Sequence, residues 1–467
     1  MGGKGAGLKP LSLSTLADLA GAKLIRGNGE RVAFGVSLDS RSIKPGELFV
    51  AIRGPKHDGH SHLAEAAEKG AIAALVQKQE VKKIPAGFGL LLVEDTQKAL
   101  QQMARGYRRM LPVRVVSVTG SSGKSSTKEM LAAVLGTMGQ THRTPGNLNN
   151  HFGVPLTLMG IGAEDMWAVV ELAMNAPGEI GPLAELAEPE AGLVTNIGWA
   201  HVEGTGSREA TAREKGALYR SLPPTGLAIS NADDPYEKMT LEGCRARVVR
   251  VGRSSEADYR LQKIACEGET TRFVCEGPRG RMEVLLPVPG AHMAMNAAQA
   301  LAAGLELGAE PNAAASALEK ISLPSGRLKL ERLHQGWLID DSYNANPDSL
   351  SAGLHTLQEL PGEGRNVALL GAMAELGSFS RMLHEEAGAS VARGKIGLCL
   401  AIGEEAKFLV EAAKKIRSGN WVRWYSKREE LVQAYVHEAI ASDRVLVKGS
   451  RREGMEAVAA RLREVKK

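Results

Sequence analysis

The chain has 467 residues, of which 43% are hydrophobic and 24% charged, and its formal net charge is +5. This length predicts two or three domains rather than a single core. Because only 4% of the residues are aromatic and no basic run stands out, the composition argues against a nucleic-acid-binding protein. A small positive excess is equally typical of proteins that bind small anionic substrates.

The N-terminal segment, residues 1–27, predicts a capped amphipathic helix and not a signal peptide, because Asp18 interrupts its apolar part. No run of eighteen apolar residues occurs, so no membrane-spanning helix is predicted. The four cysteines show neither C-x-x-C pairing nor the spacing of zinc ligands. We therefore expect reduced thiols and a cytoplasmic protein.

Three blocks of predicted elements follow one another along the chain. Residues 1–110 mix short strands with alanine-rich helices. Residues 111–324 alternate apolar strands with helices, which predicts a parallel sheet covered on both faces, and 257–290 add antiparallel strands. Segment 321–327 predicts a linker, and residues 325–467 repeat the alternation of a Rossmann-like domain. We therefore expect a three-domain α/β protein.

The stretch "TGSSGKSS" follows an apolar strand and opens a helix, as phosphate-binding loops do. Its spacing is not that of the standard P-loop, because Val118 stands where the first glycine belongs. Glycines let backbone N–H groups approach a phosphate, Lys124 can neutralise phosphate oxygens, and the Ser125 hydroxyl can bind Mg²⁺. The residues predicted to bind nucleotide here are Thr119, Gly120, Ser121, Ser122, Gly123, Lys124, Ser125 and Ser126. The alternative is a plain strand–turn–helix junction with a serine cap.

Several isolated polar residues are weak signals when taken one at a time. Glu171 lies in an apolar strand, where a carboxylate is costly to bury without a cation; downstream of a phosphate loop, a Mg²⁺ ligand is the better interpretation. His201 is in a loop, and Lys215 and Asn296 are on predicted helices. Asp341 precedes a proline-initiated helix. Surface, capping or turn roles remain the alternatives for these four.

Together with the loop, these residues resemble the Mur ligase family, the ATP-dependent amide-forming enzymes of peptidoglycan precursor synthesis, whose loop has the form T-G-x-x-G-K-[ST]. The resemblance covers nearly the whole chain. It implies a UDP-sugar-binding domain (1–110), a central ATP-binding domain of P-loop type (111–324) and a C-terminal Rossmann-like domain (325–467). It also implies ATP and two Mg²⁺ as cofactors and an acyl-phosphate intermediate.

The resemblance assigns roles to the isolated residues. Lys124, His201 and Lys215 would be catalytic. Glu171 and His201 would bind Mg²⁺ with Ser125, and Lys215 would be carbamylated, which turns a cation into a carboxylate-like ligand for a second Mg²⁺. Asn296 would contact adenine, and Arg327 and Asp341 would reach the nucleotide from the C-terminal domain.

Longer stretches indicate a branch of the family. "LDSRSIKPGELFVAIRG" is similar to the UDP-sugar domain, and "TPGNLNNHFGVPLTL", "ELAMNAPGEI" and "DDSYNANPDSL" resemble the dipeptide-adding branch. This implies UDP-N-acetylmuramoyl-tripeptide and D-alanyl-D-alanine as partners, with no nucleic acid or membrane partner, and we expect a monomer. The implied substrate-binding residues are Asp39, Ser40, Arg41, Asn147, Asn149, Asn150, Tyr343 and Asn346.

Three positions depart from the family pattern, where Ala173 replaces a glycine, Met293 an asparagine and Ala372 an aspartate. Three alternatives stay open. The first is the branch that adds a single diamino acid, and the second is a folylpolyglutamate-synthase-like ligase, which has no place for the N-terminal block. The third, from another class, is a P-loop regulatory NTPase.

Overall fold

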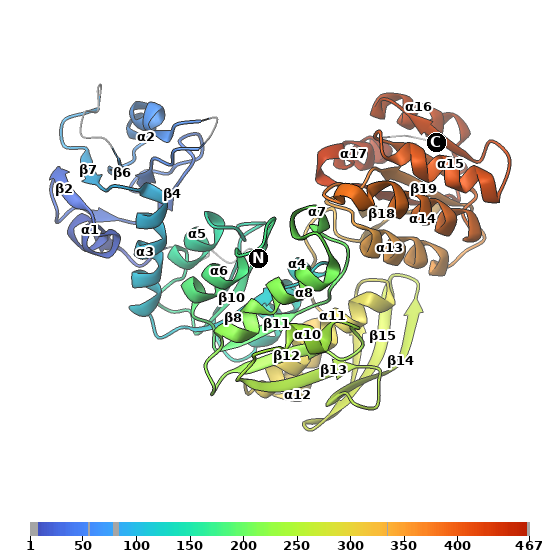
Figure 1. Ribbon diagram of the computed structural model, residues 1–467, viewed down its shortest axis with the longest axis horizontal. Helices are drawn as coiled ribbons and strands as arrows, with labels where there is room; N and C mark the ends of the chain where they lie inside the picture. Colours follow the sequence, from blue (N-terminus) through green and yellow to red (C-terminus); the bar gives the residue numbers. More distant parts are fainter. Residues whose placement is uncertain (1–7, 55–56, 78–83, 334, 465–467) are drawn as a thin grey trace. The chain divides into compact units, whose positions relative to one another are not determined.

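The computed structural model describes residues 8–54, 57–77, 84–333 and 335–464 (Figure 1). The chain packs into two compact units. The first unit combines the residues up to 117 with 139–173 and 179–191. The second unit combines 118–138 and 174–178 with the residues from 192 onwards.

The N-terminal part of the first unit is built on a five-stranded sheet in the order β2-β7-β6-β5-β4. Strands β4 to β7 run parallel, whereas β2 pairs antiparallel with β7. Buried side chains such as Phe49, Leu63 and Leu90 form its core. The elements are β1 (Leu11–Ser12), α1 (Leu13–Ala20), β2 (Lys23–Arg26), β3 (Val32–Ala33), β4 (Val36–Ser37), β5 (Leu48–Val50), η1 (Gly59–His62), α2 (Leu63–Glu68), β6 (Ala73–Val76), β7 (Gly89–Leu92) and α3 (Thr96–Arg109).

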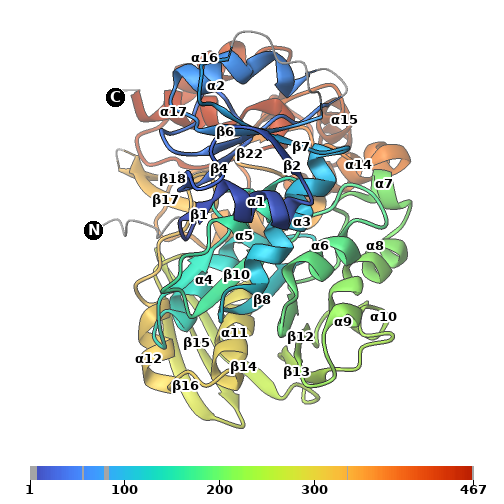
Figure 2. The ribbon, with the colours of Figure 1, turned by 90° about the vertical axis from the view of Figure 1, so that its left-hand side faces the viewer.

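Helix α1 confirms the predicted N-terminal helix. It begins after Ser12, whose Oγ accepts a hydrogen bond from the Thr15 N–H, and ends at Gly21 in the left-handed region. Helices α1 and α3 pack side by side (Figure 2). The part of the predicted segment before residue 8 lies outside the described residues.

The largest sheet has nine strands in the order β16-β15-β14-β13-β12-β11-β8-β10-β9. Its strands are β8 (Arg114–Thr119), β9 (Thr141–Arg143), β10 (Trp167–Glu171), β11 (Ala191–Val194), β12 (Leu227–Asn231), β13 (Arg247–Gly252), β14 (Tyr259–Glu267), β15 (Thr270–Gly277) and β16 (Gly280–Leu286). Strands β12, β13 and β14 are parallel neighbours. The pairs β14–β15 and β15–β16 are antiparallel, which confirms the prediction for 257–290.

Helices connect and cover these strands. They are α4 (Lys124–Leu135), α5 (Gly153–Met159), α6 (Ile180–Ala187), α7 (Val202–Thr205), α8 (Arg208–Lys215), α9 (Ala217–Ser221), α10 (Glu237–Thr240), α11 (Ala291–Glu306) and α12 (Pro311–Leu318). In the second unit α11 packs against α4 and against β12 to β15. Its small alanine side chains allow this close approach, and most of its residues are therefore buried. This packing places α11 beside the start of α4.

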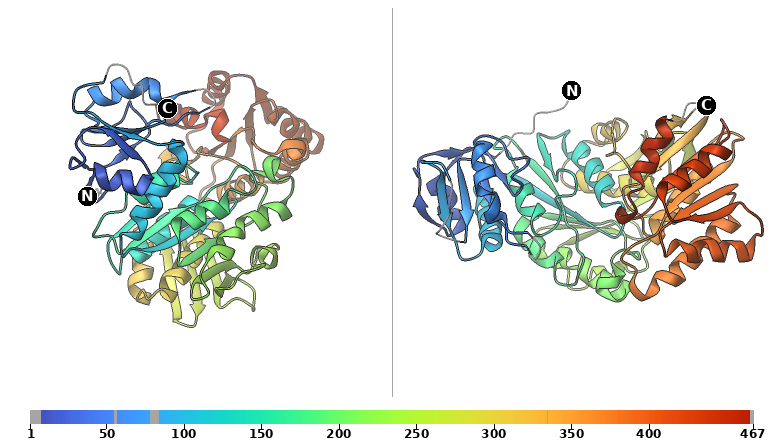
Figure 3. Two further views of the ribbon diagram at one scale, coloured as in Figure 1. Left: turned by 60° about the vertical axis from the view of Figure 1, so that its left-hand side comes forward. Right: turned by 90° about the horizontal axis from the view of Figure 1, so that it is seen from above.

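The C-terminal sheet has six strands in the order β17-β18-β22-β19-β20-β21, parallel except for the edge strand β17. It lies between two layers of helices (Figure 3), and α16 and α17 pack on one face. The elements are β17 (Lys329–Leu333), β18 (Gly336–Asp341), α13 (Pro347–Glu359), β19 (Asn366–Gly371), η2 (Gly377–Phe379), α14 (Ser380–Arg393), β20 (Leu398–Ile402), α15 (Ala406–Ile416), β21 (Val422–Tyr425), α16 (Arg428–Glu438), β22 (Arg444–Lys448), η3 (Arg451–Glu453) and α17 (Glu456–Glu464).

The predicted α/β class with parallel sheets is confirmed. Segment 321–327 contains no helix or strand, whereas the domain limits at 110/111 and 324/325 stay predictions. All four cysteines are free thiols. Within the described ranges, no helix has both the length and the apolar character that crossing a bilayer requires.

Candidate active site

The turn between β8 and α4 has no room for a side chain at its two glycines. Gly120 has φ +148°, and a Cβ added there would lie 1.8 Å from Thr195 Oγ1. Gly123 has φ +79°, and its added Cβ would lie 2.7 Å from Asn296 Oδ1. Both backbone conformations favour glycine. The chain therefore needs Gly120 and Gly123 for this turn to form.

The segment that follows β11 holds the turn in place. The Ser121 N–H donates to the Asn196 backbone oxygen at 2.9 Å, and the Ser122 N–H donates to Asn196 Oδ1 at 3.0 Å. The Thr195 hydroxyl donates to the Ser122 carbonyl oxygen at 2.5 Å. Sequence reasoning missed Thr195 and Asn196. Their signal was a polar pair directly after a buried strand.

Helix α4 begins at Lys124, so the turn leads directly into a helix N-terminus. Lys124 Nζ donates to the Gly120 carbonyl oxygen at 2.8 Å, which folds the side chain back over the turn. Thr119, Ser125 and Ser126 are buried. Backbone N–H groups and the dipole of a helix N-terminus attract anions. The geometry of the turn is therefore suited to a phosphate group.

Lys215 is the last residue of α8 and is completely buried. Its Nζ has no hydrogen-bond partner among the described residues. Burial, followed by the positive charge of Lys124, lowers the pKa of Lys215 well below the ordinary value for lysine. The prediction that Lys215 lies on a helix is confirmed, and the alternative of a solvated surface lysine is wrong. A lowered pKa increases the fraction of the neutral amine, which is the nucleophilic form.

His201 lies next to a carboxylate from the C-terminal part of the second unit. Its Nδ1 is 2.5 Å from Glu375 Oε2. Burial lowers the pKa of His201; Glu375 opposes this shift, and the charges of Lys124 and Lys215 add to it. Both His201 and Glu375 have φ +62°, a conformation that costs free energy in residues other than glycine and is frequent at functional sites. Sequence reasoning did not identify Glu375.

Asn296 is buried on α11 with its amide beside Gly123. Its Nδ2 is 3.7 Å from the sulfur of Met293, one of the three positions that depart from the family pattern. One turn further along, Gln299 Nε2 donates to the Val194 carbonyl oxygen at 3.1 Å, which ties α11 to β11. Asn296 therefore lies at the phosphate turn. Its predicted contact with adenine stays a prediction.

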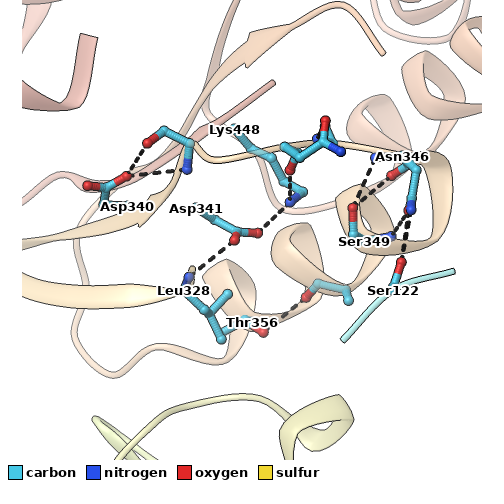
Figure 4. Close-up of polar contacts among 12 residues, drawn as sticks. Ser122, Leu328, Asp340, Asp341, Asn346, Ser349, Thr356 and Lys448 are labelled. Carbon is cyan, nitrogen blue, oxygen red and sulfur yellow. Dashed lines mark hydrogen bonds and ion pairs between the residues drawn. The ribbon is translucent and has the colours of Figure 1, made fainter. Parts of the chain in front are cut away.

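Asp341, at the end of β18, takes part in a buried ion pair (Figure 4). Its Oδ2 accepts from Lys448 Nζ at 2.5 Å and its Oδ1 from the Leu328 N–H at 3.1 Å. Burial raises the pKa of Asp341, and Lys448 opposes that shift. The Arg327 guanidinium lies 4.1 Å from the centre of the Tyr343 ring, a distance typical of cation–π contacts.

Asn346 joins the C-terminal part of the second unit to the phosphate turn (Figure 4). Its Nδ2 donates to Ser122 Oγ at 2.9 Å, and its Oδ1 accepts from the Ser349 N–H as the N-cap of α13. Two residues on, Asp348 Oδ2 accepts from the Trp199 N–H at 2.8 Å. The first turn of α13 therefore contacts two loops of the central sheet. Sequence reasoning placed Asn346 with the substrate and missed Asp348.

In the first unit, Glu171 ends β10 and is 1% exposed. Asn149 Nδ2 donates to Glu171 Oε1 at 2.7 Å, so one predicted substrate residue contacts one predicted metal ligand. The Asn147 backbone oxygen accepts from the Asn149 N–H, and Asn150 Oδ1 accepts from the Gly153 N–H at the start of α5. The stretch 147–150 is therefore shaped by its own asparagines.

Asp39 and Arg41, also in the first unit, form a bidentate ion pair. Arg41 Nε and Nη2 donate to the two carboxylate oxygens of Asp39 at 2.9 and 2.8 Å. These hydrogen bonds lower the pKa of Asp39 to about 2. Ser40 is buried and its hydroxyl donates to Glu65 Oε2 at 2.8 Å. The exposed Arg41 guanidinium is therefore held in one orientation.

The predicted metal ligands offer few anionic oxygens. In the part of the chain that the structure describes, no three His, Cys, Asp or Glu side chains gather as a metal site. The predicted set, Ser125, Glu171, His201 and Lys215, contains one carboxylate and one imidazole. Mg²⁺ prefers oxygen ligands. The buried Lys215 Nζ, which has no partner among the residues that the structure describes, is compatible with a carbamate, which would add two oxygens.

Ala173 and Ala372 are the other two positions that depart from the family pattern. The Ala173 N–H donates to the Asn149 backbone oxygen at 2.8 Å. Ala372 is completely buried, and a Cβ added at Gly403 would lie 2.6 Å from the Ala372 Cβ. Position 372 is therefore closely packed against Gly403.

Comparison with known proteins matches three family models in succession. They are the catalytic domain of the Mur ligase family over residues 34–108, the Mur ligase middle domain over 118–304, and the glutamate ligase domain of Mur ligases over 326–451. The chain belongs to the Mur ligase family. It is an ATP-dependent ligase with the three α/β domains of that family, as predicted.

Curated relatives and solved structures identify the branch that the chain resembles. The UDP-N-acetylmuramoyl-tripeptide–D-alanyl-D-alanine ligase of Bacillus subtilis is 36% identical over 90% of this chain and 91% of its own length. The Escherichia coli enzyme of that name is 37% identical over 97% and 98%. The crystal structure of MurF from Acinetobacter baumannii has a TM-score of 0.89 and 30% identity, and covers 98% of this chain and 100% of its own.

A crystal structure of the MurF ligase from Thermotoga maritima in complex with ADP has a TM-score of 0.80 and 26% identity. It covers 92% of this chain and 97% of its own length. These similarities extend over the N-terminal, central and C-terminal blocks together, and are not confined to the phosphate turn.

Proposed function

We propose that this ligase adds D-alanyl-D-alanine to UDP-N-acetylmuramoyl-tripeptide at the expense of ATP, in cytoplasmic peptidoglycan precursor synthesis. The observation that carries the ATP chemistry is the glycine turn 120–123, which is closed by Thr195 and Asn296 and followed by Lys124 at a helix N-terminus. The substrates are taken from the relatives, whose printed names state both the tripeptide and the dipeptide.

The reaction makes an amide from a carboxylate, which is a poor electrophile until it is activated. An oxygen of the tripeptide carboxylate attacks the γ-phosphorus of ATP, and ADP leaves, which gives an acyl phosphate. The amine of D-alanyl-D-alanine then attacks the acyl carbon, loses a proton, and phosphate leaves. Because the reactants are anions, the protein contributes mainly by positioning them and neutralising charge.

Residues around the turn would bind the nucleotide. The backbone N–H groups of Gly123 and of the first turn of α4 would hold the phosphates, and Lys124 would exchange its bond to the Gly120 carbonyl for a phosphate oxygen. Asn296 would contact the base, and Arg327 and Asp341 would contact the nucleotide from the C-terminal domain. The support for Lys124 is its position at the mouth of the turn.

We include two Mg²⁺ ions in the proposal: Ser125, Glu171 and His201 would hold one, and a carbamate on Lys215 would help to hold the other. When bound, the two ions would neutralise the triphosphate and the carboxylate as they meet. The carbamate forms when the neutral Lys215 amine attacks CO₂, which makes an N–C bond and releases a proton. Support comes from the buried Nζ, its lowered pKa and its lack of a hydrogen-bond partner among the described residues.

Substrate contacts complete the proposal. In the N-terminal domain they are Asp39, Ser40 and Arg41, whose guanidinium is exposed and held by Asp39. The asparagines 147, 149 and 150 would contact the peptide, and Tyr343 and Asn346 would act from the C-terminal domain. We propose that the protein works as a monomer with domains 1–110, 111–324 and 325–467.

A single coupled assay tests the function. The purified protein receives ATP, Mg²⁺, UDP-linked tripeptide and D-alanyl-D-alanine, and the product is identified by its mass. We expect ADP, phosphate and the UDP-linked pentapeptide. ADP release with UDP-linked dipeptide and a single diamino acid would instead indicate the tripeptide-forming branch. Hydrolysis of ATP without any amine acceptor would indicate a regulatory NTPase.

A further inference from the structure

Lys448 is a buried charge that the proposed mechanism does not use. It is the last residue of β22 and is 2% exposed. Its Nζ donates to Asp341 Oδ2 at 2.5 Å and to the Asn344 carbonyl oxygen at 2.9 Å (Figure 4). Burying a lysine is costly unless its charge is paired and its donors are satisfied. The ion pair with Asp341 and the bond to the Asn344 carbonyl oxygen meet this requirement.

The partner of Lys448 connects three segments of the C-terminal domain. Asp341 ends β18, Lys448 ends the neighbouring strand β22, and the second carboxylate oxygen of Asp341 accepts from the Leu328 N–H. Leu328 follows the segment 321–327 and has φ +53°. Without Lys448, the Asp341 carboxylate would retain the hydrogen bond from the Leu328 N–H but would lose its charged partner.

The second bond of Lys448 leads toward the phosphate turn. Lys448 Nζ holds the carbonyl of Asn344, two residues before Asn346. Asn346 in turn contacts Ser122 Oγ at 2.9 Å and, more weakly, the Ser121 carbonyl oxygen at 3.5 Å. The Asn344 side chain also accepts from the Arg451 N–H at 3.2 Å. The loop 342–346 is therefore fixed at its centre by Lys448 at the end of β22 and by Arg451 at the start of η3.

We propose that Lys448 is a positioning residue for nucleotide binding. It fixes the Asp341 carboxylate and the loop 342–346, so that Asn346 stays against the phosphate turn. Lys448 itself does not touch the nucleotide. This inference rests on the proposed function, because it requires ATP to bind at turn 120–123.

The test compares Lys448→Met with Arg463→Met. Methionine keeps most of the side-chain volume of lysine and removes the charge. Arg463 is the matched control, since it pairs with Asp340, the preceding residue on β18, at 2.6 Å and with Glu331. ADP affinity is measured by calorimetry with full-length protein, and the KM for ATP and kcat are measured in the coupled assay. Thermal unfolding reports the stability of each variant.

We expect Lys448→Met to weaken ADP binding at least tenfold and to raise the KM for ATP more than it lowers kcat. Arg463→Met should leave the ADP affinity and the KM for ATP within twofold of the wild-type values, whatever its effect on thermal unfolding. Lys448→Arg, which keeps the charge, should recover part of the affinity. Lys448→Gln, which removes the charge but keeps a hydrogen-bond donor, serves as the test variant if Lys448→Met does not fold.

Wild-type ADP affinity in Lys448→Met, or in Lys448→Gln if that variant has to be used, would overturn the inference and leave the proposed function intact. Equal losses of affinity in the Lys448 and Arg463 variants would also overturn it, because they would indicate a general structural effect. Wild-type protein that fails to bind ADP would overturn both proposals.

Discussion

At the scale of single residues, the phosphate turn depends on the absence of two side chains. Gly120 adopts a φ of +148° and faces the Thr195 hydroxyl, which in turn holds the Ser122 carbonyl oxygen. A methyl group at 120 would strain the backbone and displace Thr195. The turn would then lose the hydrogen bond that shapes it.

We predict that Gly120→Ala lowers ligase turnover by more than tenfold and destabilises the protein by about 1 to 3 kcal/mol. Gly280→Ala is the control, because Gly280 has φ +108° but no atom lies within 4 Å of an added Cβ. The control should lose stability while it keeps its turnover. Denaturant unfolding and the coupled assay measure the two effects; equal turnover in both variants would contradict the role of the clash.

Lys215 allows a second test at this scale. We predict that Lys215→Ala loses at least about 99% of ligase turnover and regains part of it when short carboxylic acids are added, because the acid can occupy the place of the carbamate. Lys124→Ala should lose turnover to a similar extent without rescue, since a carboxylate cannot replace a cation. Full turnover of Lys215→Ala without added acid would refute the carbamate.

At the scale of secondary structure elements, α13 combines two tasks in its first turn. Asn346 caps the helix through its Oδ1 and contacts the phosphate turn through its Nδ2. An aspartate would retain the cap but would replace the amide donor with a negative charge beside Ser122. The two tasks can therefore be separated by one substitution.

We predict that Asn346→Asp keeps the free energy of unfolding within about 0.5 kcal/mol and raises the KM for ATP several-fold, because a carboxylate repels phosphate. The reverse exchange at another N-cap, Asp95→Asn at the start of α3, should leave the KM unchanged. An unchanged KM in Asn346→Asp would show that the contact with Ser122 has no part in nucleotide binding.

At the scale of the whole molecule, the half-buried His292 links folding to pH. Burial, followed by the positive charge of Lys448, lowers the pKa of His292 to about 4. An unfolded histidine has a pKa of about 6.5. Between pH 6.5 and 4 the unfolded chain therefore binds a proton that the folded protein does not, so stability falls as the pH falls through this range.

We predict that lowering the pH from 7 to 5 removes about 1 to 2 kcal/mol of stability through His292. In His292→Gln this part of the loss should disappear, whereas His151→Gln, at an exposed histidine, should retain it. Urea unfolding at a series of pH values gives the slopes. Parallel slopes for wild type and His292→Gln would contradict this prediction.

Local patterns in the sequence determined most of the secondary structure of this protein and the position of its phosphate turn. The apolar strands, the antiparallel segment 257–290 and the capped helix α1 follow from side-chain periodicity and capping, which act over a few residues. The motif at 119–126 indicated a phosphate turn, because glycine followed by Lys and Ser at the start of a helix is typical of loops that bind phosphate. Long motifs indicated the family, which the comparisons then confirmed.

Only the tertiary structure decided which distant residues meet at the site. The roles of Thr195, Asn196, Asp348, Glu375 and Lys448 depend on partners that lie 73 to 174 positions away in the sequence. The burial of Lys215 is likewise invisible in a helix whose other residues are largely polar. Desolvation and hydrogen bonding depend on what packs around a group in space, and side-chain periodicity along the chain does not encode those neighbours.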